Sequence, residues 1–219
     1  MKLIEHIEVA SVEESHFSVI WLHGFGADGH DFEAIIPELK LPTGLNIRFI
    51  FPHAPFRSPV PDSDEKIRAW YSISSDSERT DKEIRESSHE VKLLIEAEEQ
   101  KGIKTENIIL AGFSQGGVIA LHTGLRHRKR IGGILALSTY LNDFDNTQAE
   151  MSDENLAIPI MQAHGRYDQV IPIARGATSR ENLIRLGLDV RWFDYQMAHE
   201  VCREEINDIT TFFIDVFQK

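Results

Sequence analysis

An apolar run that leads directly into a serine between two glycines is the feature that most constrains this chain. Residues 107–112 have the apolar composition of a buried strand, and a helical pattern begins at Gln115. Between them, the pentapeptide 112–116 has the form Gly-x-Ser-x-Gly, with Ser114 at its centre. A sharp turn from strand to helix leaves room only for small residues two positions before and after the serine. The sequence therefore predicts that Ser114 lies on a strained turn, clear of a sheet and at the N-terminus of a helix.

Short β-rich runs alternate with helical patterns along the rest of the chain. The runs predicted as strands are 17–22, 47–51, 107–112, 131–137, 158–163 and 190–195. The stretches predicted as helices are 28–39, 81–101, 115–127, 175–186 and 200–217. This alternation predicts an α/β fold with a mainly parallel central sheet and helices on both faces. No linker or internal repeat divides the chain, so we expect a single domain over residues 1–219 without a large lid domain.

Residues 52–77 form a long stretch without clear periodicity, and they include several prolines. A connection of this length in a compact domain is usually functional or mobile. We interpret it as a wall or rim of a binding site, with a solvated connection as the alternative.

The charge and the cysteine count exclude several classes of partner and site. The chain has 35 acidic and 23 basic residues, hence a formal net charge of −12. This balance argues against nucleic acid as the main partner and against docking on anionic lipid through a basic patch. The single cysteine, Cys202, excludes an internal disulfide and zinc sites that need several thiolates. No histidine pair has the His-x-x-x-His spacing of a zinc hydrolase, so we predict no metal and no cofactor.

The sequence also bears on where the protein is found. The N-terminus lacks the apolar region and cleavage site of a signal peptide. The apolar runs are far shorter than the roughly 20 residues that span a bilayer, and one cysteine fits a reducing compartment. We therefore expect a cytoplasmic protein.

Ser114 requires a base and an orienting acid to act as a nucleophile, because a serine hydroxyl is weak on its own. In this architecture the chain order is serine, acid, histidine. Asp168 lies in the loop after the predicted strand 158–163, and His199 in the loop after 190–195. Both loops are expected at the carboxyl edge of the sheet beside Ser114, with Asp168 bound to one ring nitrogen of His199. Asp189, before the last strand, and Asp194, inside it, are the alternative acids.

Five other residues have simpler interpretations. His164 is expected to be a structural hydrogen-bonding residue rather than the base. His122 and His127 follow the serine on the predicted helix 115–127 and are expected to face solvent or helix neighbours. Cys202 has no base of its own and is interpreted as a small buried residue in the first turn of the last helix. Glu200 is interpreted as an acid at the N-terminus of that helix, with a raised pKa of the neighbouring histidine as the alternative.

The segment 24–29 has the spacing Gly-x-Gly-x-x-Gly after a predicted strand, which is formally a dinucleotide-binding fingerprint. That function requires an acidic residue about 20 positions on, at the end of the next strand. The next strand ends in Phe-Pro-His at 51–53, without an acid. The alternative is a His-Gly loop, in which small residues bring a backbone N–H up to a substrate carbonyl. The N–H groups of Phe25 and Gln115 would then form an oxyanion hole.

Six motifs occur together and in order: WLHGFGADG at 21–29, FPHAP at 51–55, AWY at 69–71, GFSQGG at 112–117, HGRYD at 164–168 and MAHEVC at 197–202. On these motifs the chain resembles the carboxylesterase and acyl-protein thioesterase family of α/β-hydrolases, the phospholipase/carboxylesterase family, from about Phe17 onward. The resemblance implies the α/β-hydrolase fold and the hydrolysis of carboxylic esters and thioesters. It also implies a set of site residues: Ser114, Asp168 and His199 as the catalytic triad, Phe25 and Gln115 as oxyanion donors, and Trp70, His23 and Gly24 at the substrate pocket.

The chain departs from the family pattern outside the triad. The family usually has a small residue such as Gly where this chain has Ala198, Ser where it has Glu200, and Asp where it has Ser72. The segment 61–68 also differs from the loop that the family usually carries there. These departures bear on substrate preference, because this loop and Trp70 would shape the acyl site.

The leading hypothesis is a serine carboxylesterase that cleaves esters of short to medium acyl chains through an acyl-enzyme on Ser114. The alternative is an acyl-protein thioesterase that removes long acyl groups from proteins, which needs a long hydrophobic channel. A third hypothesis is a non-catalytic binding module on the same fold. The expected partners are a small-molecule ester or an acylated protein, with transient membrane contact but no stable insertion. We expect a monomer or a homodimer.

Overall fold

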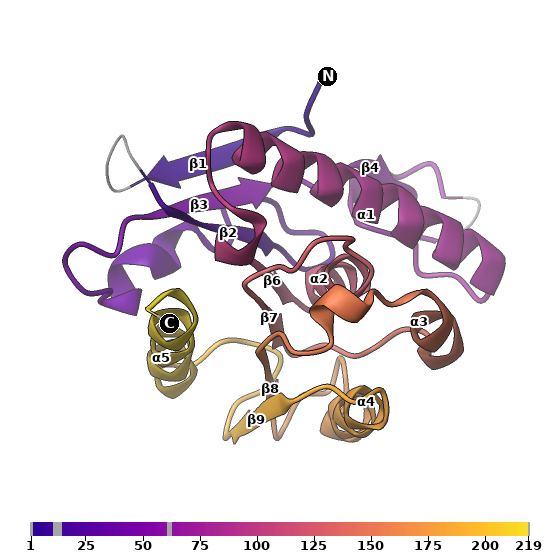
Figure 1. Cartoon of the computed structure of the whole chain (residues 1–219). Helices are drawn as coiled ribbons and strands as arrows, with labels where there is room; N and C mark the ends of the chain where they lie inside the picture. Colours follow the sequence, from indigo (N-terminus) through magenta and orange to yellow (C-terminus); the bar gives the residue numbers. More distant parts are fainter. Residues whose placement is uncertain (1, 11–14, 61–62, 219) are drawn as a thin grey trace.

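The computed structural model describes residues 2–10, 15–60 and 63–218. A seven-stranded sheet lies at its centre, with the spatial order β1-β3-β2-β6-β7-β8-β9 (Figure 1). Neighbouring strands are parallel except that β1 pairs antiparallel with β3. The predicted α/β-hydrolase fold with its mainly parallel sheet is confirmed, and the described residues contain no separate lid domain. The strands are β1 (His6–Ala10), β2 (Phe17–Leu22), β3 (Ile47–Pro52), β6 (Ile108–Phe113), β7 (Gly133–Leu137), β8 (Ile160–Gly165) and β9 (Val190–Tyr195).

All six predicted strands occur, each within two residues of its predicted bounds. The sequence pattern does not predict β1. Its residues are only half-buried or exposed, because β1 lies at the edge of the sheet, and the run is therefore not continuously apolar.

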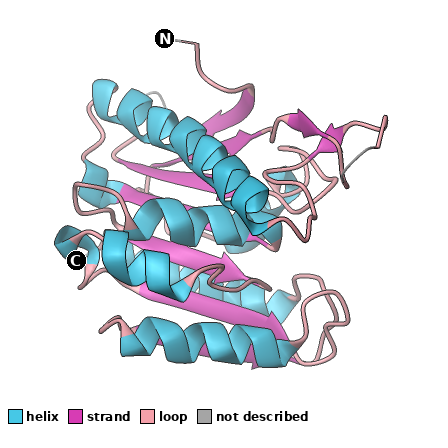
Figure 2. Ribbon diagram, turned by 90° about the vertical axis from the view of Figure 1, so that its right-hand side faces the viewer, coloured by secondary structure: helices cyan, strands magenta, loops and turns pink. Residues whose placement is uncertain are grey.

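Helices cover both faces of the sheet (Figures 1 and 2). One face carries α1 (Ser77–Gln100), α2 (Gln115–Leu125), α3 (Phe144–Glu150) and α4 (Ile173–Arg185). The other face carries α5 (Arg203–Phe217) and the 3₁₀ helix η1 (Glu33–Leu39). Two further 3₁₀ turns, η2 (Thr105–Asn107) and η3 (Asp153–Asn155), lead into β6 and toward β8.

The central strands serve both layers of the core. In β2, Ile20 and Leu22 pack with α1 and α2, whereas Val19 and Trp21 pack with η1 and α5. Successive side chains of a strand point to opposite faces, and here both faces are covered. This is why residues 19–22 are all apolar instead of alternating with polar residues.

Two helices differ from their predicted bounds for local reasons. The predicted helix 28–39 is only a 3₁₀ helix, because Pro37 inside it lacks a backbone donor. The predicted helix 81–101 begins earlier, at Ser77, because Asp76 caps it. The Asp76 carboxylate accepts from the N–H groups of Glu78 and Arg79, both at 3.1 Å.

The last helix begins at Arg203 rather than at residue 200. The interpretation of Glu200 as an acid at the N-terminus of this helix is therefore wrong. Its carboxylate instead accepts a hydrogen bond from the N–H of Ala198 at 3.3 Å, within the loop before the helix. Cys202 is half-buried and immediately precedes the helix, so its predicted place inside the first turn is also wrong.

Residues 52–77 contain a short antiparallel hairpin of β4 (Phe56–Arg57) and β5 (Ile67–Arg68). Its base is closed by a hydrogen bond from the N–H of Ala69 to the carbonyl of Pro55 at 3.0 Å. The N–H of Gly26 donates to the carbonyl of Arg68 at 2.9 Å, which ties the hairpin to the glycine loop. Strands of two residues are too short for a sequence period. Residues 61 and 62 of the predicted rim lie outside the described residues.

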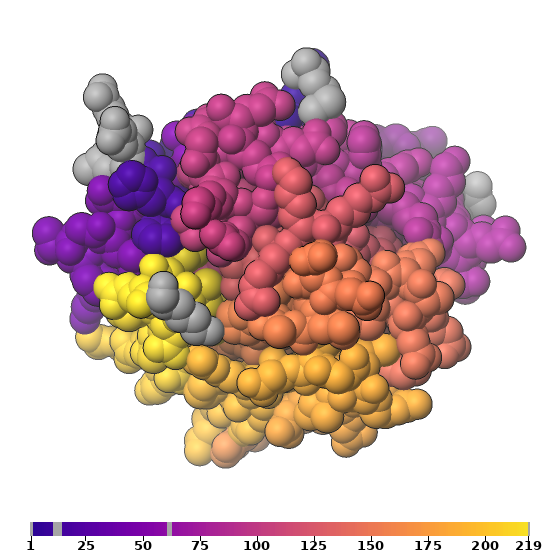
Figure 3. All heavy atoms as spheres, in the orientation of Figure 1, coloured from indigo at the N-terminus to yellow at the C-terminus, as the bar shows by residue number. Residues whose placement is uncertain are grey.

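Segments from the beginning, middle and end of the chain meet on one face of the molecule (Figure 3). On this face the segment after α2 lies beside α1. Within the described ranges, no helix combines the length and the apolar character needed to cross a bilayer.

Candidate active site

Ser114 occupies the turn between β6 and α2 with φ 54° and ψ −120°. A residue with a Cβ rarely adopts a positive φ, so the turn is strained, as the sequence predicts. The flanking glycines are required sterically. A Cβ on Gly112 would overlap the carbonyl of Gly116, and a Cβ on Gly116 would overlap the carbonyl of Leu22. Both overlaps are with backbone atoms, which cannot move aside as a flexible side chain could. Positions 112 and 116 therefore accept only glycine.

Hydrogen bonds hold the strained turn in place. The N–H of Ser114 donates to the carbonyl of Leu137 at 2.9 Å, and the Thr139 hydroxyl donates to the carbonyl of Ser114 at 2.7 Å. Both partners belong to β7 or to the loop after it, so tertiary contacts offset the backbone strain. Ser114 is thereby fixed at the carboxyl edge of the sheet, 7% exposed.

The side chain of Asp168 is fully buried in the loop after β8. One carboxylate oxygen, Oδ1, accepts from the N–H groups of Val170 and Ile171 at 2.9 and 2.8 Å. The other, Oδ2, lies 2.7 Å from Nδ1 of His199. Burial of a carboxylate is tolerated only when its oxygens are hydrogen-bonded, and here each oxygen has a partner. The two backbone bonds fix which oxygen faces the histidine.

His199 lies in the loop after β9, and its side chain is 16% exposed. Because Nδ1 is bound to Asp168, the Nε2 atom is left free to face the serine. The imidazole ring packs 4.7 Å from the ring of Phe113, the residue before Ser114. Among the described residues, no hydrogen bond joins Nε2 to the Ser114 hydroxyl. Such bonds are often long in a free enzyme and shorten when substrate binds.

Backbone contacts join the loops that carry the acid and the histidine. A Cβ on Gly165 would overlap the carbonyl of Ala198, so only glycine lets the two loops approach this closely. The N–H of Tyr167 donates to the carbonyl of Met197 at 3.0 Å. The distance between Asp168 and His199 is therefore set by the backbones that carry them.

The alternative acids and nucleophile are engaged elsewhere. Asp194 pairs with Arg166 and accepts a hydrogen bond from the indole of Trp192, and Asp189 lines a separate surface cavity at the opposite edge of the sheet. Burial raises the pKa of the Cys202 thiol, which disfavours the thiolate that a nucleophile requires. His164 donates from Nε2 to the carbonyl of Ile171 at 2.8 Å, as expected for a structural histidine.

The two predicted oxyanion donors lie on the loops that follow β2 and β6. Within the described part of the chain, neither the N–H of Phe25 nor that of Gln115 donates to a backbone carbonyl. Gly24 lies directly against the serine: a Cβ there would come within 3.5 Å of Cβ of Ser114 and 3.3 Å of the Phe113 ring. The N–H of Phe25 and the N–H of Gln115 are therefore both free among the described residues, and they lie on the two loops that flank the serine.

The side chain of Gln115 holds the backbone of residues 70–71. Its amide oxygen accepts from the N–H of Trp70 at 2.8 Å, and its amide nitrogen donates to the carbonyl of Tyr71 at 2.5 Å. The indole N–H of Trp70 in turn donates to the carbonyl of His23 at 2.9 Å. A chain of hydrogen bonds, which we call the Gln115 clamp, therefore links the loops of both predicted oxyanion donors.

The structure encloses Trp70 completely and leaves only 1% of His23 exposed. Their side chains therefore do not line an open pocket. They contact the backbone of the glycine loop, which in turn lies beside Ser114. The His23 ring bonds the carbonyl of Gly24 at 2.7 Å through Nδ1, and its Nε2 accepts from the N–H of Ala54 at 3.0 Å. Burial lowers the pKa of His23 to about 4, so it is neutral and donates from Nδ1. The spacing of residues in the motif at 21–29 does not predict these contacts, because they involve residues far along the chain.

Within the described ranges, no group of three or more His, Cys, Asp or Glu side chains could hold a metal ion. The candidate reacting groups at this edge of the sheet are a serine on a strained turn, a histidine bonded to a buried carboxylate, and two free N–H groups.

A seven-stranded sheet of this topology with a serine elbow at its carboxyl edge defines an α/β-hydrolase. The family model for Phospholipase/Carboxylesterase matches residues 4–216, which includes β1. The chain belongs to this family, and its members are hydrolases.

Individual relatives agree with this membership. The chain is 35% identical over 208 residues to acyl-protein thioesterase 1 of Gibberella zeae, covering 89% of this chain and 88% of the relative. It is 31% identical over 224 residues to acyl-protein thioesterase 1 of Neurospora crassa, covering 96% and 91%. Among solved structures it is similar to Arabidopsis thaliana SOBER1, with a TM-score of 0.83 and 26% identity over 91% of this chain and 98% of that one.

Proposed function

We propose that this chain is a serine carboxylesterase that hydrolyses esters of short to medium acyl chains through an acyl-enzyme on Ser114. The observation that carries the proposal is the 2.7 Å bond between Asp168 and Nδ1 of His199, at the edge of the sheet where the serine turn lies. This bond supports the tautomer in which Nε2 has no proton and can accept one. The free N–H groups of Phe25 and Gln115 support an oxyanion hole.

The proposed reaction has two halves. Ser114 Oγ forms a bond to the ester carbonyl carbon as its proton passes to Nε2 of His199. The carbonyl oxygen becomes an oxyanion that accepts from the N–H groups of Phe25 and Gln115. The intermediate then releases the alcohol, which takes the proton from Nε2. Water repeats the sequence on the acyl-enzyme and releases the acid. Each donor of such a hole typically contributes about 2.7–4 kcal/mol to the transition state.

Gly24, His23 and Trp70 have positioning roles in this proposal. Gly24 keeps the space over the serine open for the substrate carbonyl, because a side chain there would crowd the ring of Phe113 and fill the space beside Ser114. His23 and Trp70 hold the loop that presents the Phe25 N–H. No step requires a metal or a cofactor.

The test is the Ser114→Ala variant with p-nitrophenyl butyrate as substrate. We expect turnover to fall to the background rate and a fluorophosphonate probe to stop labelling the protein, with an unchanged circular dichroism spectrum. Ser152→Ala is a matched control, because Ser152 caps nothing with its side chain and its N–H bonds the end of α2, far from the site. Unchanged turnover in Ser114→Ala would reject the assignment. Absence of labelling in the wild type would favour the non-catalytic binding module.

A second candidate function is the removal of long acyl chains from proteins. Two observations favour it: the two fungal relatives named above are acyl-protein thioesterases, and apolar side chains are exposed in the segments that follow β3 and β8, at the same edge as Ser114. These are Phe56, Ile73, Tyr167 and Val170, each 58–68% exposed. A series of p-nitrophenyl esters from two to sixteen carbons, with a palmitoylated peptide thioester beside it, separates the candidates. No gain in kcat/KM beyond about six carbons would reject the long-chain function.

Three further points remain predictions: a single domain over residues 1–219, a cytoplasmic location, and a monomer or homodimer. Light scattering coupled to size-exclusion chromatography would measure the last.

A further inference from the structure

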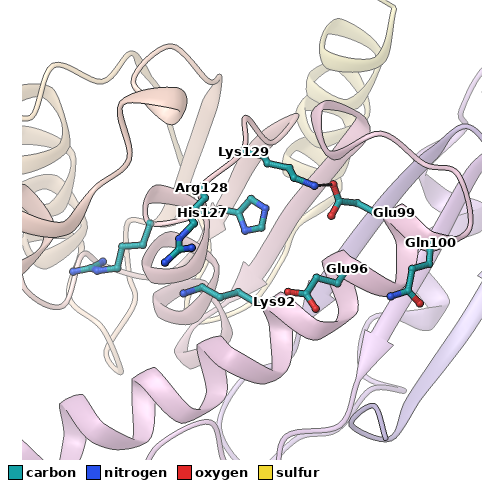
Figure 4. Close-up of a pocket in the computed structure, with 8 residues that line it drawn as sticks. Lys92, Glu96, Glu99, Gln100, His127, Arg128 and Lys129 are labelled. Carbon is teal, nitrogen blue, oxygen red and sulfur yellow. Dashed lines mark hydrogen bonds and ion pairs between the residues drawn. The ribbon is translucent and has the colours of Figure 1, made fainter. Parts of the chain in front are cut away.

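A charged cavity lies between α1 and the segment that follows α2, away from the serine (Figure 4). Its volume is about 880 Å³, within the range of small-molecule sites. The α2 helix begins at the serine turn, and residues 126–129 follow its other end. A helix of 11 residues spans about 16 Å, so the cavity lies at the opposite edge of the sheet from Ser114.

The cations around this cavity outnumber their carboxylate partners. Four of them line it, Lys92, Arg126, Arg128 and Lys129. Arg126 pairs with Glu150 at 2.7 Å, and Lys129 pairs with Glu99 at 2.6 Å. Among the described residues, Lys92 and Arg128 pair with no carboxylate. Figure 4 shows the side chains of Lys92 and Arg128 close to each other and to the ring of His127.

Two further observations indicate that this cluster is suited to hold an anion. The Nε2 atom of His127 is buried and has no hydrogen-bond partner among the described residues, and buried polar atoms rarely stay unpaired. Burial lowers the pKa of Lys92, and the charges of Arg126 and Arg128 lower it further. The cations around the half-buried Lys92 therefore repel each other, although the whole chain carries a net charge of −12.

We infer that this cavity binds a phosphate dianion, either free or as the phosphoryl group of a small molecule, between Lys92, Arg128 and His127. Two unpaired cations match the charge of the dianion. The guanidinium of Arg128 can bind two oxygens side by side, and the ammonium of Lys92 acts as a point charge. The ring of His127 supplies the remaining polar atom. The cavity is larger than one phosphate, which leaves room for the molecule that carries it.

Glu96 also lines the cavity and opposes an anion. It lies one turn after Lys92 on α1 and forms no ion pair with a described cation. The site should thus bind phosphate with modest affinity, which Glu96→Gln should increase.

The test is isothermal titration of the whole protein with inorganic phosphate, at constant ionic strength maintained with chloride. We expect saturable binding of one phosphate per chain. The affinity should fall at least fivefold in Lys92→Gln and in Arg128→Gln, and should rise in Glu96→Gln. Lys82→Gln is the matched control: Lys82 is exposed on the same helix, about 15 Å from Lys92 along the axis.

Other outcomes would overturn the inference: no saturable binding, equal affinity in Lys92→Gln and the wild type, or an equal loss in Lys82→Gln, which would indicate a general charge effect. Ester hydrolysis should be the same in Lys92→Gln and the wild type. The phosphate proposal and the catalytic proposal are therefore tested independently of each other. Sedimentation with phosphatidylcholine vesicles that contain phosphatidic acid identifies the source. Wild-type sedimentation that is lost in Lys92→Gln assigns the phosphate to a lipid, and binding of free phosphate alone assigns it to a soluble molecule.

Discussion

Replacing Asp168 by Asn tests how the buried carboxylate sets the tautomer of the histidine. In the wild type, Oδ1 accepts from two backbone N–H groups and Oδ2 faces Nδ1 of His199. An amide has only one acceptor oxygen. In Asp168→Asn that oxygen should stay with the two N–H groups, which places the amide nitrogen against Nδ1. The ring must then carry its proton on Nε2, where it can no longer accept the proton of Ser114.

The structure bounds the size of this effect. Restoring the productive tautomer would require the amide to turn over, which leaves the buried N–H of Ile171 and the part-buried N–H of Val170 facing a donor. An unpaired donor costs about 1–3 kcal/mol, hence about 2–6 kcal/mol for the two, with the part-buried one toward the lower value. At 1.36 kcal/mol per factor of ten, this corresponds to a decrease in kcat between about 30-fold and about 3 × 10⁴-fold. Loss of the negative charge that stabilises the imidazolium places the expected value near 10³–10⁴-fold.

The assay is steady-state hydrolysis of p-nitrophenyl butyrate, with urea unfolding to show that the variant is folded. We expect kcat to fall and KM to change little, because the tautomer matters only once proton transfer begins. Asp194→Asn is the matched control, since its ion pair with Arg166 lies on the surface and its loss should leave kcat within about twofold. A folded Asp168→Asn variant whose kcat falls less than tenfold would refute the reasoning.

Three further predictions concern single side chains. Gly24→Ala should lower kcat/KM by roughly tenfold to 100-fold without unfolding the protein, because the new Cβ would crowd the ring of Phe113 at 3.3 Å and occupy the space beside Ser114. Gln115→Ala should lower the free energy of unfolding by about 2–6 kcal/mol, because two buried backbone groups lose their partner while the Gln115 N–H itself is retained. Glu205 is fully buried, and burial, with the charge of Asp208, raises its pKa from 4.5 to about 8. Between these values the folded chain holds a proton that the unfolded chain releases, so the free energy of unfolding should fall as pH rises, by up to about 1.4 kcal/mol per pH unit. Glu205→Gln should flatten this dependence.

Each of these predictions has its own measurement. Steady-state kinetics of ester hydrolysis measure kcat and KM of Gly24→Ala. Kinetics equal to the wild type would show that the loop accommodates a Cβ at this position. Urea unfolding measures the stability of Gln115→Ala. A decrease in the free energy of unfolding below about 1 kcal/mol would mean that water replaces the hydrogen bonds of the Gln115 side chain. Unfolding at several pH values between 4.5 and 8 checks the glutamate. An identical slope in the wild type and Glu205→Gln would assign the dependence to other groups.

The features that sequence could predict are those set by neighbours along the chain. The serine turn follows from two glycines at fixed spacing, because a Cβ on Gly112 would overlap the backbone of Gly116 only four residues further along the chain. The strands of the central sheet follow from continuous apolar runs, because both faces of the sheet are covered. The order of the serine, acid and histidine loops follows from the alternation of strands and helices.

The features that sequence did not predict depend on residues far apart along the chain. The amide of Gln115 bonds residues 70–71, about 45 positions earlier, and no local pattern marks that pairing. His122 is another case: it is only 9% exposed, although solvent was one of its two expected environments, and burial and the charge of Arg126 lower its pKa to about 3. The charged cavity likewise joins Lys92 with residues 126–129, which meet only because α1 packs beside α2.

The hydrogen bond that closes the base of the hairpin has a consequence for protein engineering. It joins Ala69 to Pro55, so the stretch between them leaves and rejoins the body of the enzyme at one point. Residues 70–71 immediately beyond it are held by Gln115, next to the nucleophile. Loops grafted between the two closing residues should therefore exchange acyl preference as a unit, provided that the contact of the Arg68 carbonyl with the N–H of Gly26 is kept. A graft that extends two residues further would disturb the proposed oxyanion hole, because it would break the bonds of residues 70–71 to Gln115.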